Sequence, residues 1–424
     1  MNSSLCYKKL HLGNHSNTLT HYLLFFFIWP FGAWIYSVLT ANKKNSYVIF
    51  FLFSLLLCWH MSPVGLSGMY DDFMGIYQRF QETKMSTDEL LKQIHGYFTF
   101  EDYAPKELYE SVVIWFVKLF TNNYHFYFLI CAIPVAFFQL KSLSLITSDK
   151  RYEEGTWLGL IFIILFILPR DIVTVQNPRF TTGFWLCLSS TLYYFSKGRK
   201  KIYLVPILIS PLIHSALWVY VGIISIYLII PKNTRLLEWG LICTLPLMFI
   251  SSDFLLKIDL SQILPPSLYR WSTFHNTKEA YEAMEGMGRA GFWWFGVSID
   301  IGRKVMYAVM AIWLIKKKNE TMQNHESSSL YPFFLFIVIV VNCIHTVPVL
   351  GERFYFFIRI FTIFIWFKAF YSKYFSFILC LFAICGWEMI VRYGYFFGGA
   401  LSVNTSPDLF YAPLPYLMGK GLFW

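Results

Sequence analysis

The strongest local pattern for chemistry is the tripeptide Asn177-Pro178-Arg179, which precedes an apolar run over 180–196. Asparagine favours the N-cap of a helix and proline favours the first turn, so the pattern predicts a helix that begins here. The unpaired N–H groups of a helix N-terminus attract anions, and a planar guanidinium adds two-pronged hydrogen bonding. Arg179 is therefore a candidate anion-binding residue. The plain alternative is an arginine that extends to lipid head groups.

A single histidine, His214, follows Pro211 inside the next apolar stretch. If the intervening chain is helical, His214 lies about 20 Å from the basic residue Lys201. The ordinary pKa of histidine is close to neutrality, which suits a general base or a hydrogen-bond donor. His214 is thus a candidate catalytic base. The alternative is a structural histidine that bonds to Ser215 or to the backbone carbonyl freed by Pro211.

Two further groups of polar residues flank other apolar runs. Asp72 and Tyr77 lie in the first long polar segment, where a carboxylate and a phenol suit a sugar hydroxyl, although solvated acids are common in loops. His345 and Arg353 surround a short late turn, and Glu352 is placed to neutralise Arg353. The Asp72 carboxylate could bind a cation or a sugar hydroxyl, and Tyr77, His345 and Arg353 are candidate substrate-binding residues.

Three more arginines, Arg170, Arg270 and Arg289, are candidates for binding an anionic substrate. Arg170 has a simpler interpretation as the ion-pair partner of Asp171. The motifs HExxH, DxD and GxxxxGK[ST] are absent from the sequence. The sequence therefore predicts neither a metal site nor any other cofactor.

The elements that must position these residues are long apolar runs. Hydrophobic residues make up 56% of the 424 residues and charged residues 14%, whereas a soluble domain has about 25% charged residues. Runs over 21–39, 47–64, 124–146 and 330–347 approach the ~20 residues that a bilayer span requires. Aromatic residues reach 21%, which suits membrane interfaces. The fold class predicted is an all-α polytopic integral membrane protein.

The formal net charge of +10 comes from basic residues in short loops, which indicates topology rather than binding of nucleic acid. If positive loops face the cytoplasm, about twelve membrane-embedded helical segments return both termini to the outer face. The basic clusters that determine this threading lie at 43–44, 150–151, 197–201, 232–235, 316–318 and 368–373.

The sequence predicts a single membrane domain over residues 1–424. Three regions of this domain differ from simple membrane-spanning helices. Residues 202–230 have basic loops at both ends, which predicts a broken helical hairpin bent near His214. Residues 65–123 form the first long outer loop, with a short interfacial helix at 108–120. Residues 252–291 form the second long outer loop, and loops of this length are typically lids or binding elements.

Taken together, these residues resemble the EpsG-like branch of the Wzy-type polysaccharide polymerases, which make O-antigen, capsule or exopolysaccharide. The likeness spans most of residues 20–390, although the family's usual Asp-Tyr in the first loop is Asp72-Phe73 here. The residues that carry it are Asp72-Phe73, Tyr77, Arg179, Pro211-Leu212-Ile213-His214-Ser215 and Arg353.

The resemblance implies a GT-C-like membrane glycosyltransferase of the bacterial inner membrane whose active site faces the periplasm. Its substrates would be glycans linked to undecaprenyl pyrophosphate, with a flippase and a chain-length regulator as possible partners. His214, or else Asp72, would take the proton of the acceptor hydroxyl. Arg179 and Arg353 would hold the pyrophosphate without a metal ion.

Two rival functions remain compatible with the sequence. A transporter or flippase for lipid-linked oligosaccharide would also need a cationic cavity, but it predicts internal repeats, and none is visible. A membrane acyltransferase that modifies surface sugars would use a histidine, with less need for several outer arginines.

Overall fold

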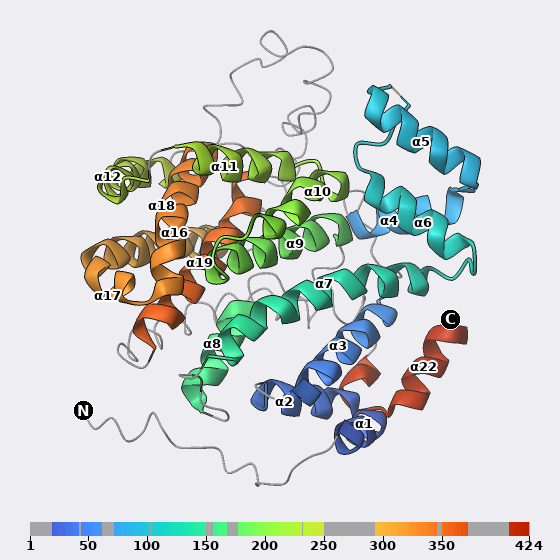
Figure 1. The fold of residues 1–424 in the computed structure, drawn as a ribbon. Coiled ribbons are helices and arrows are strands. Elements are labelled where there is room, and N and C mark those ends of the chain that lie inside the picture. Colours follow the sequence, from blue (N-terminus) through green and yellow to red (C-terminus); the bar gives the residue numbers. More distant parts are fainter. Residues whose placement is uncertain are drawn as a thin grey trace. The chain divides into compact units, whose positions relative to one another are not determined.

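The computed structural model describes residues 19–41, 44–61, 72–101, 103–149, 152, 156–167, 177–230, 232–249, 293–345, 350–371 and 407–423. Within these residues the protein has 17 α-helices, a few short 3-10 turns and no β-strand. The all-α class predicted from the sequence is confirmed (Figure 1).

The described residues fall into two compact units. The first takes in those within Met1–Ser190, Leu212–His214 and Cys385–Trp424, and the second those within Thr191–Pro211 and Ser215–Ile384. Each unit is described by itself below. The candidate site lies wholly in the first.

A long helix organises the first unit. α7 (Tyr124–Thr147) begins at Asn123, whose side chain accepts a hydrogen bond from the backbone N–H of His125 at 2.9 Å. α3 (Lys44–Trp59) packs along α7 in the antiparallel direction (Figure 1). Tyr47, near the start of α3, hydrogen bonds to Thr147 at the end of α7, and the ring of Trp59 lies 5.5 Å from that of His125.

Two helices at the start of the chain pack with one near its end. α1 (Leu19–Ile28) and α2 (Pro30–Leu39) share an apolar core with α3, the 3-10 turn Pro407–Phe410 and α22 (Leu414–Phe423). The indole N–H of Trp29 donates to the carbonyl of Phe410 at 2.7 Å, and Lys420 pairs with Asp408 at 2.6 Å. α8 (Trp157–Ile167) follows α7 and is almost wholly apolar.

The predicted first outer loop, 65–123, contains three helices: α4 (Asp72–Glu82), α5 (Thr87–Thr99) and α6 (Leu108–Lys118). The side chain of Ser86 caps α5 by accepting from the N–H of Glu89 at 3.1 Å. α6 corresponds to the short helix predicted at 108–120. Its 11 residues rise about 16 Å, roughly half of a bilayer's apolar thickness.

The next helices follow the sequence pattern closely. α9 (Pro178–Ser196) begins at the predicted residue and is 19 residues long. Over the predicted hairpin, 202–230, the chain forms α10 (Val205–Ile213) and α11 (Leu217–Ile229), with a break at 214–216. Two helical arms and a break at His214 are therefore present, while the hairpin's path through a membrane stays a prediction.

The second unit is built around α18 (His325–Ile344). This helix packs against α11, α19 (Leu350–Phe370), α17 (Lys318–Gln323) and α12 (Thr234–Thr244), and α16 (Trp293–Lys316) contacts α17 and α19. Large rings fill the core where these helices meet, among them Tyr227, Phe333 and Phe361.

Basic side chains connect several segments of the second unit through ion pairs and hydrogen bonds. Lys318 pairs with Glu238 at 2.8 Å, and buried Lys368 pairs with Glu326 at 2.5 Å. Arg199, which follows α9, donates to the hydroxyl of Ser329 at 3.2 Å. All of these contacts lie near the start of α18 or of α12, so the basic segments of this unit gather at one end.

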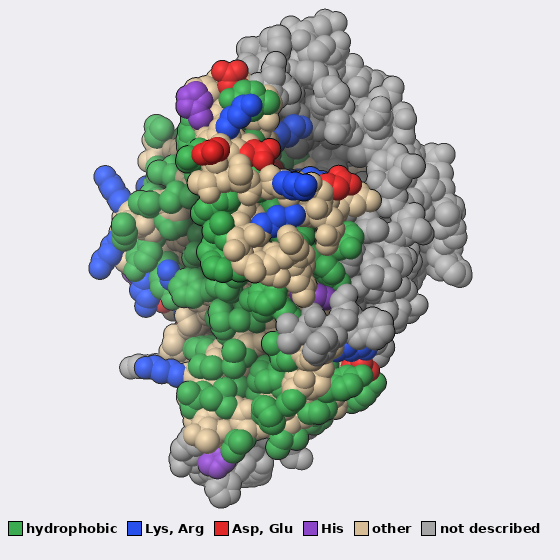
Figure 2. Space-filling view, turned by 90° about the vertical axis from the view of Figure 1, so that its right-hand side faces the viewer, with side chains coloured by type: hydrophobic (Ala, Val, Ile, Leu, Met, Phe, Trp, Pro, Cys, Tyr) green, Lys and Arg blue, Asp and Glu red, His purple; other side chains and the backbone are tan. Residues whose placement is uncertain are grey.

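Two described helices, α7 and α18, are long and apolar enough to cross a bilayer by length and composition. Shorter apolar helices include α1, α2, α3, α8, α10 and α11. Many large apolar side chains on these short helices are exposed, such as Phe27, Leu208 and Trp218. Figure 2 shows a face on which charged side chains gather in the upper part, with hydrophobic side chains covering much of the described surface below.

Candidate functional site

Two buried carboxylates mark the start of α6. Glu107 immediately precedes the helix and Glu110 lies in its first turn, and each residue is 7% exposed. Both carboxylates contact the same guanidinium, that of Arg179, so they face the same side of the start of α6. The partial positive charge of a helix N-terminus favours acids here, but burying two of them requires cationic partners.

Arg179 provides one such partner from the first turn of α9. The side-chain oxygen of Asn177 accepts a hydrogen bond from the backbone N–H of Phe180 at 3.3 Å, so the predicted N-cap is confirmed. Pro178 occupies the first helical position, where its missing N–H costs nothing. This cap fixes the direction in which Arg179 leaves the helix.

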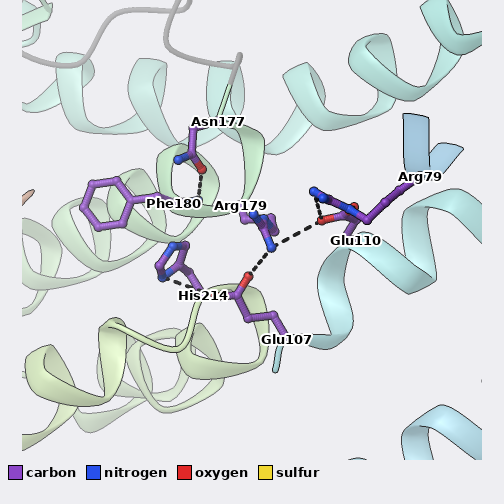
Figure 3. Close-up of polar contacts among 7 residues, drawn as sticks. All are labelled: Arg79, Glu107, Glu110, Asn177, Arg179, Phe180 and His214. Carbon is purple, nitrogen blue, oxygen red and sulfur yellow. Dashed lines mark hydrogen bonds and ion pairs between the residues drawn. The ribbon is translucent and has the colours of Figure 1, made fainter. Parts of the chain in front are cut away.

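The guanidinium of Arg179 contacts both carboxylates of α6. Its Nη1 atom lies 3.0 Å from Oε2 of Glu107 and 3.3 Å from Oε2 of Glu110. Arg79 of α4 approaches Glu110 from the other side, with Nε 2.5 Å from Oε1 and Nη2 3.3 Å from Oε2. Two cations and two carboxylates thus balance within one cluster (Figure 3).

His214 completes the cluster at the break after α10. Its Nδ1 atom lies 3.5 Å from Oε1 of Glu107, and both side chains are more than nine-tenths buried. The edge of the imidazole also packs against the ring of Phe180, with 5.3 Å between centroids and 78° between planes. Figure 3 shows the carboxylate of Glu107 between the imidazole and the guanidinium of Arg179.

Neighbouring side chains hold this arrangement in place. The hydroxyl of Thr182 on α9 donates to the hydroxyl of Tyr109 on α6 at 3.3 Å, which links the two helices that carry the ion pairs. Tyr97 of α5 lies close enough to the cluster that burial, and then the charge of Glu107, raises the pKa of its hydroxyl. The Tyr97 hydroxyl is thus held further from ionisation than an ordinary tyrosine.

The arrangement combines three chemical abilities. A histidine can accept or donate a proton, a guanidinium can bind a phosphate by two parallel hydrogen bonds, and a buried carboxylate can orient both. Because the groups are largely removed from water, their electrostatic interactions are screened less than on a surface. Such a cluster suits proton transfer next to a bound anion.

The remaining sequence-predicted residues are distributed as follows. Tyr77 lies on α4, where its ring meets that of Tyr124 edge-on at 5.0 Å. Asp72 opens α4, but its side chain lies outside the described residues. Arg353, in the first turn of α19, and His345, which follows α18 and packs on Tyr355 at 5.3 Å, belong to the second unit.

The other three candidates, Arg170, Arg270 and Arg289, lie outside the described residues. The structure thus brings together Arg179 and His214, as the sequence analysis proposed for a shared site. For the other candidate residues, participation in that site stays a prediction.

The two glutamates of the cluster were not predicted from the sequence, and Arg79 was not selected among the candidates. One signal was available: Glu107 and Glu110 stand three residues apart directly ahead of the apolar run of α6. Paired acids at the start of a short apolar helix are costly to bury, so they call for cationic partners.

Comparisons with protein families, with curated proteins and with solved structures gave no match for this chain.

Proposed function

We propose that this protein is a polytopic membrane glycosyltransferase that polymerises oligosaccharide units linked to undecaprenyl pyrophosphate. The observation that supports the proposal best is the single carboxylate of Glu107, shared between the guanidinium of Arg179 and the imidazole of His214. It places a phosphate-binding group and a proton acceptor side by side, which transfer from a pyrophosphate leaving group requires.

The location of the cluster supports transfer at the outer face. Tyr77 and Arg79 lie on α4 next to the start of α7, whereas the end of α7 leads to the basic pair 150–151. The 24 residues of α7 rise about 36 Å, enough to separate the two faces of a bilayer. The cluster therefore belongs to the end opposite the basic loop, which the positive-inside rule assigns to the outside.

The contacts within the second unit are consistent with the same threading. Ion pairs and hydrogen bonds join Arg199, Lys318 and Lys368 to residues near the starts of α12 and α18. The positive-inside rule assigns the segments that carry these basic residues to the cytoplasm. Segments on the same side of a membrane should lie together, and these do. We assign the full set of about twelve membrane-embedded segments on this basis.

In the proposed reaction, the acceptor hydroxyl oxygen attacks the anomeric carbon of the donor glycan. A new glycosidic bond forms, and the bond from that carbon to the lipid pyrophosphate oxygen breaks, with its electron pair leaving on the pyrophosphate. The hydroxyl proton passes to His214. Arg179 holds the developing negative charge.

Charge balance sets a condition on this proposal. Glu107 and Glu110 already offset the charges of Arg179 and Arg79, so the cluster alone does not neutralise a pyrophosphate. The rest of that charge requires further cations, and Arg270, Arg289 and Arg353, which the sequence predicts to bind substrate, are the candidates for this role.

The test uses purified protein in liposomes supplied with lipid-linked repeat units. We expect a ladder of products that differ by one repeat unit. Movement of the substrate between leaflets without reaction would instead establish the flippase, and a gain of acyl mass on the sugar would establish the acyltransferase.

A further inference from the structure

We propose that Glu107 is a positioning residue that orients His214 for proton transfer; this inference rests on the proposed function. The carboxylate uses different oxygens for its two partners: Oε1 lies 3.5 Å from Nδ1 of His214, and Oε2 lies 3.0 Å from Nη1 of Arg179. One acid therefore faces both groups without forcing them to compete for the same atom.

The carboxylate determines which nitrogen of the imidazole accepts a proton. An ionised carboxylate only accepts hydrogen bonds, so the neutral ring is favoured with its hydrogen on Nδ1, facing Glu107. The lone pair then lies on Nε2, the nitrogen turned away from Glu107. The ring of Phe180, edge-on at 5.3 Å, limits rotation of the imidazole.

The carboxylate also stabilises the charge that proton transfer creates. When Nε2 of His214 accepts the hydroxyl proton, the ring becomes a cation beside the permanent cation of Arg179. The buried imidazolium and the partly exposed guanidinium repel each other, and an acid between them offsets that repulsion. The proton stays on Nε2 until it is released to solvent.

Glu110 offers a matched comparison on the same helix. It is as buried as Glu107 and also contacts Arg179, but its other ion pair is with Arg79 on α4 rather than with His214. Glu110→Gln therefore removes the same charge from the same cluster. The difference between the two variants reports on the contact with His214.

The experiment measures polymerisation of lipid-linked repeat units by purified full-length variants in liposomes. For Glu107→Gln we expect kcat to fall by ~10- to 100-fold with KM little changed, a smaller loss than the ~10²- to 10⁴-fold expected for removing a general base. Glu107→Asp keeps the charge with a shorter reach and should recover part of that loss.

A double-mutant cycle separates positioning from a general structural role. If Glu107 acts through His214, adding Glu107→Gln to His214→Gln causes no further loss of kcat. When Glu110→Gln is combined with His214→Gln, by contrast, the fold-losses of kcat of the two single variants multiply. Should Glu107→Gln fail to accumulate in the membrane, the same cycle is run with Glu107→Asp. Thermal unfolding in detergent monitors the fold of every variant.

Three results would overturn the inference: full turnover in Glu107→Gln, a loss no larger than that of Glu110→Gln, or losses that multiply in the Glu107/His214 double variant. These outcomes are distinct from failure of the proposed function. If the proposed function is wrong, the wild-type protein itself produces no ladder.

Discussion

The guanidinium of Arg179 lies 3.0 Å from a carboxylate oxygen of Glu107, which joins the start of α9 to the start of α6. Both residues are at helix N-termini, where the backbone favours the acid and disfavours the arginine. Two acids, Glu107 and Glu110, contact the arginine and offset this unfavourable position. This balance of charges leads to the predictions that follow.

The first prediction concerns the N-cap that orients Arg179. Asn177→Ala removes the hydrogen bond to the backbone N–H of Phe180 and should lower the free energy of unfolding by ~0.5–2 kcal/mol. Asn177→Ser keeps a capping oxygen and should be close to wild type. Thermal unfolding in detergent checks both variants, and equal stability of the alanine and serine variants would contradict the capping role.

The second prediction concerns topology. Reporter fusions after Lys200 and Lys317 should give cytoplasmic signals, because both positions lie in basic loops. The neighbouring residues Arg199 and Lys318 form contacts near the start of α18 and of α12, respectively. An accessible tag inserted after Glu101 should be labelled from the outside. An outside signal at Lys200 would contradict both the hairpin and the assignment of the cluster to the outer face.

The third prediction separates the charge of Arg179 from its shape. Arg179→Ala leaves Glu107 and Glu110 buried without this cation and should cost ~3–5 kcal/mol of stability. Arg179→Lys keeps the charge and should accumulate normally. However, it loses the planar fork that binds a phosphate by two hydrogen bonds, so polymer length should fall.

The same change at Arg79 serves as the control. Its side chain is 48% exposed, and ion pairs at such positions contribute about 0–1 kcal/mol. We therefore expect Arg79→Lys to have a smaller effect on both protein level and polymer length, measured by immunoblot and by gel analysis of the glycan. Normal polymer length in Arg179→Lys would exclude the proposed bidentate contact.

Much of the local structure was predictable because it depends on neighbours in the chain. The Asn177-Pro178 pair specifies a helix start through capping, and α7 follows directly from the apolar run over 124–146. The break at His214 agrees with the basic loops at both ends of 202–230. In each case the determining pattern lies within one continuous stretch of the chain.

The composition of the cluster was only partly predictable, because it depends on contacts between distant helices. Glu107 and Glu110 stand at the start of α6 as ordinary polar residues, and no periodicity specifies that α9 supplies their cation. Arg79 meets Glu110 only because α4 packs next to the start of α7. Pairing of charges across helices is a property of tertiary packing, which local sequence patterns do not encode.

The last prediction is that His214 takes part in the chemical step. His214→Gln keeps a hydrogen-bonding side chain of similar reach but cannot accept a proton at neutral pH. The buried environment beside Glu107 and Phe180 should accommodate glutamine, so the variant should accumulate normally. Loss of a general base typically removes ~10²- to 10⁴-fold of rate, so products should shrink to single repeat units.

A purely structural histidine would behave differently. In that case His214→Gln would retain activity, whereas His214→Ala would open a cavity against Phe180, leave Glu107 with fewer partners and lower the amount of folded protein. Gel analysis of the glycan, with immunoblots for protein level, distinguishes the two cases. If the glutamine variant builds long chains at the wild-type rate, His214 is not the base, and Asp72 becomes the leading candidate.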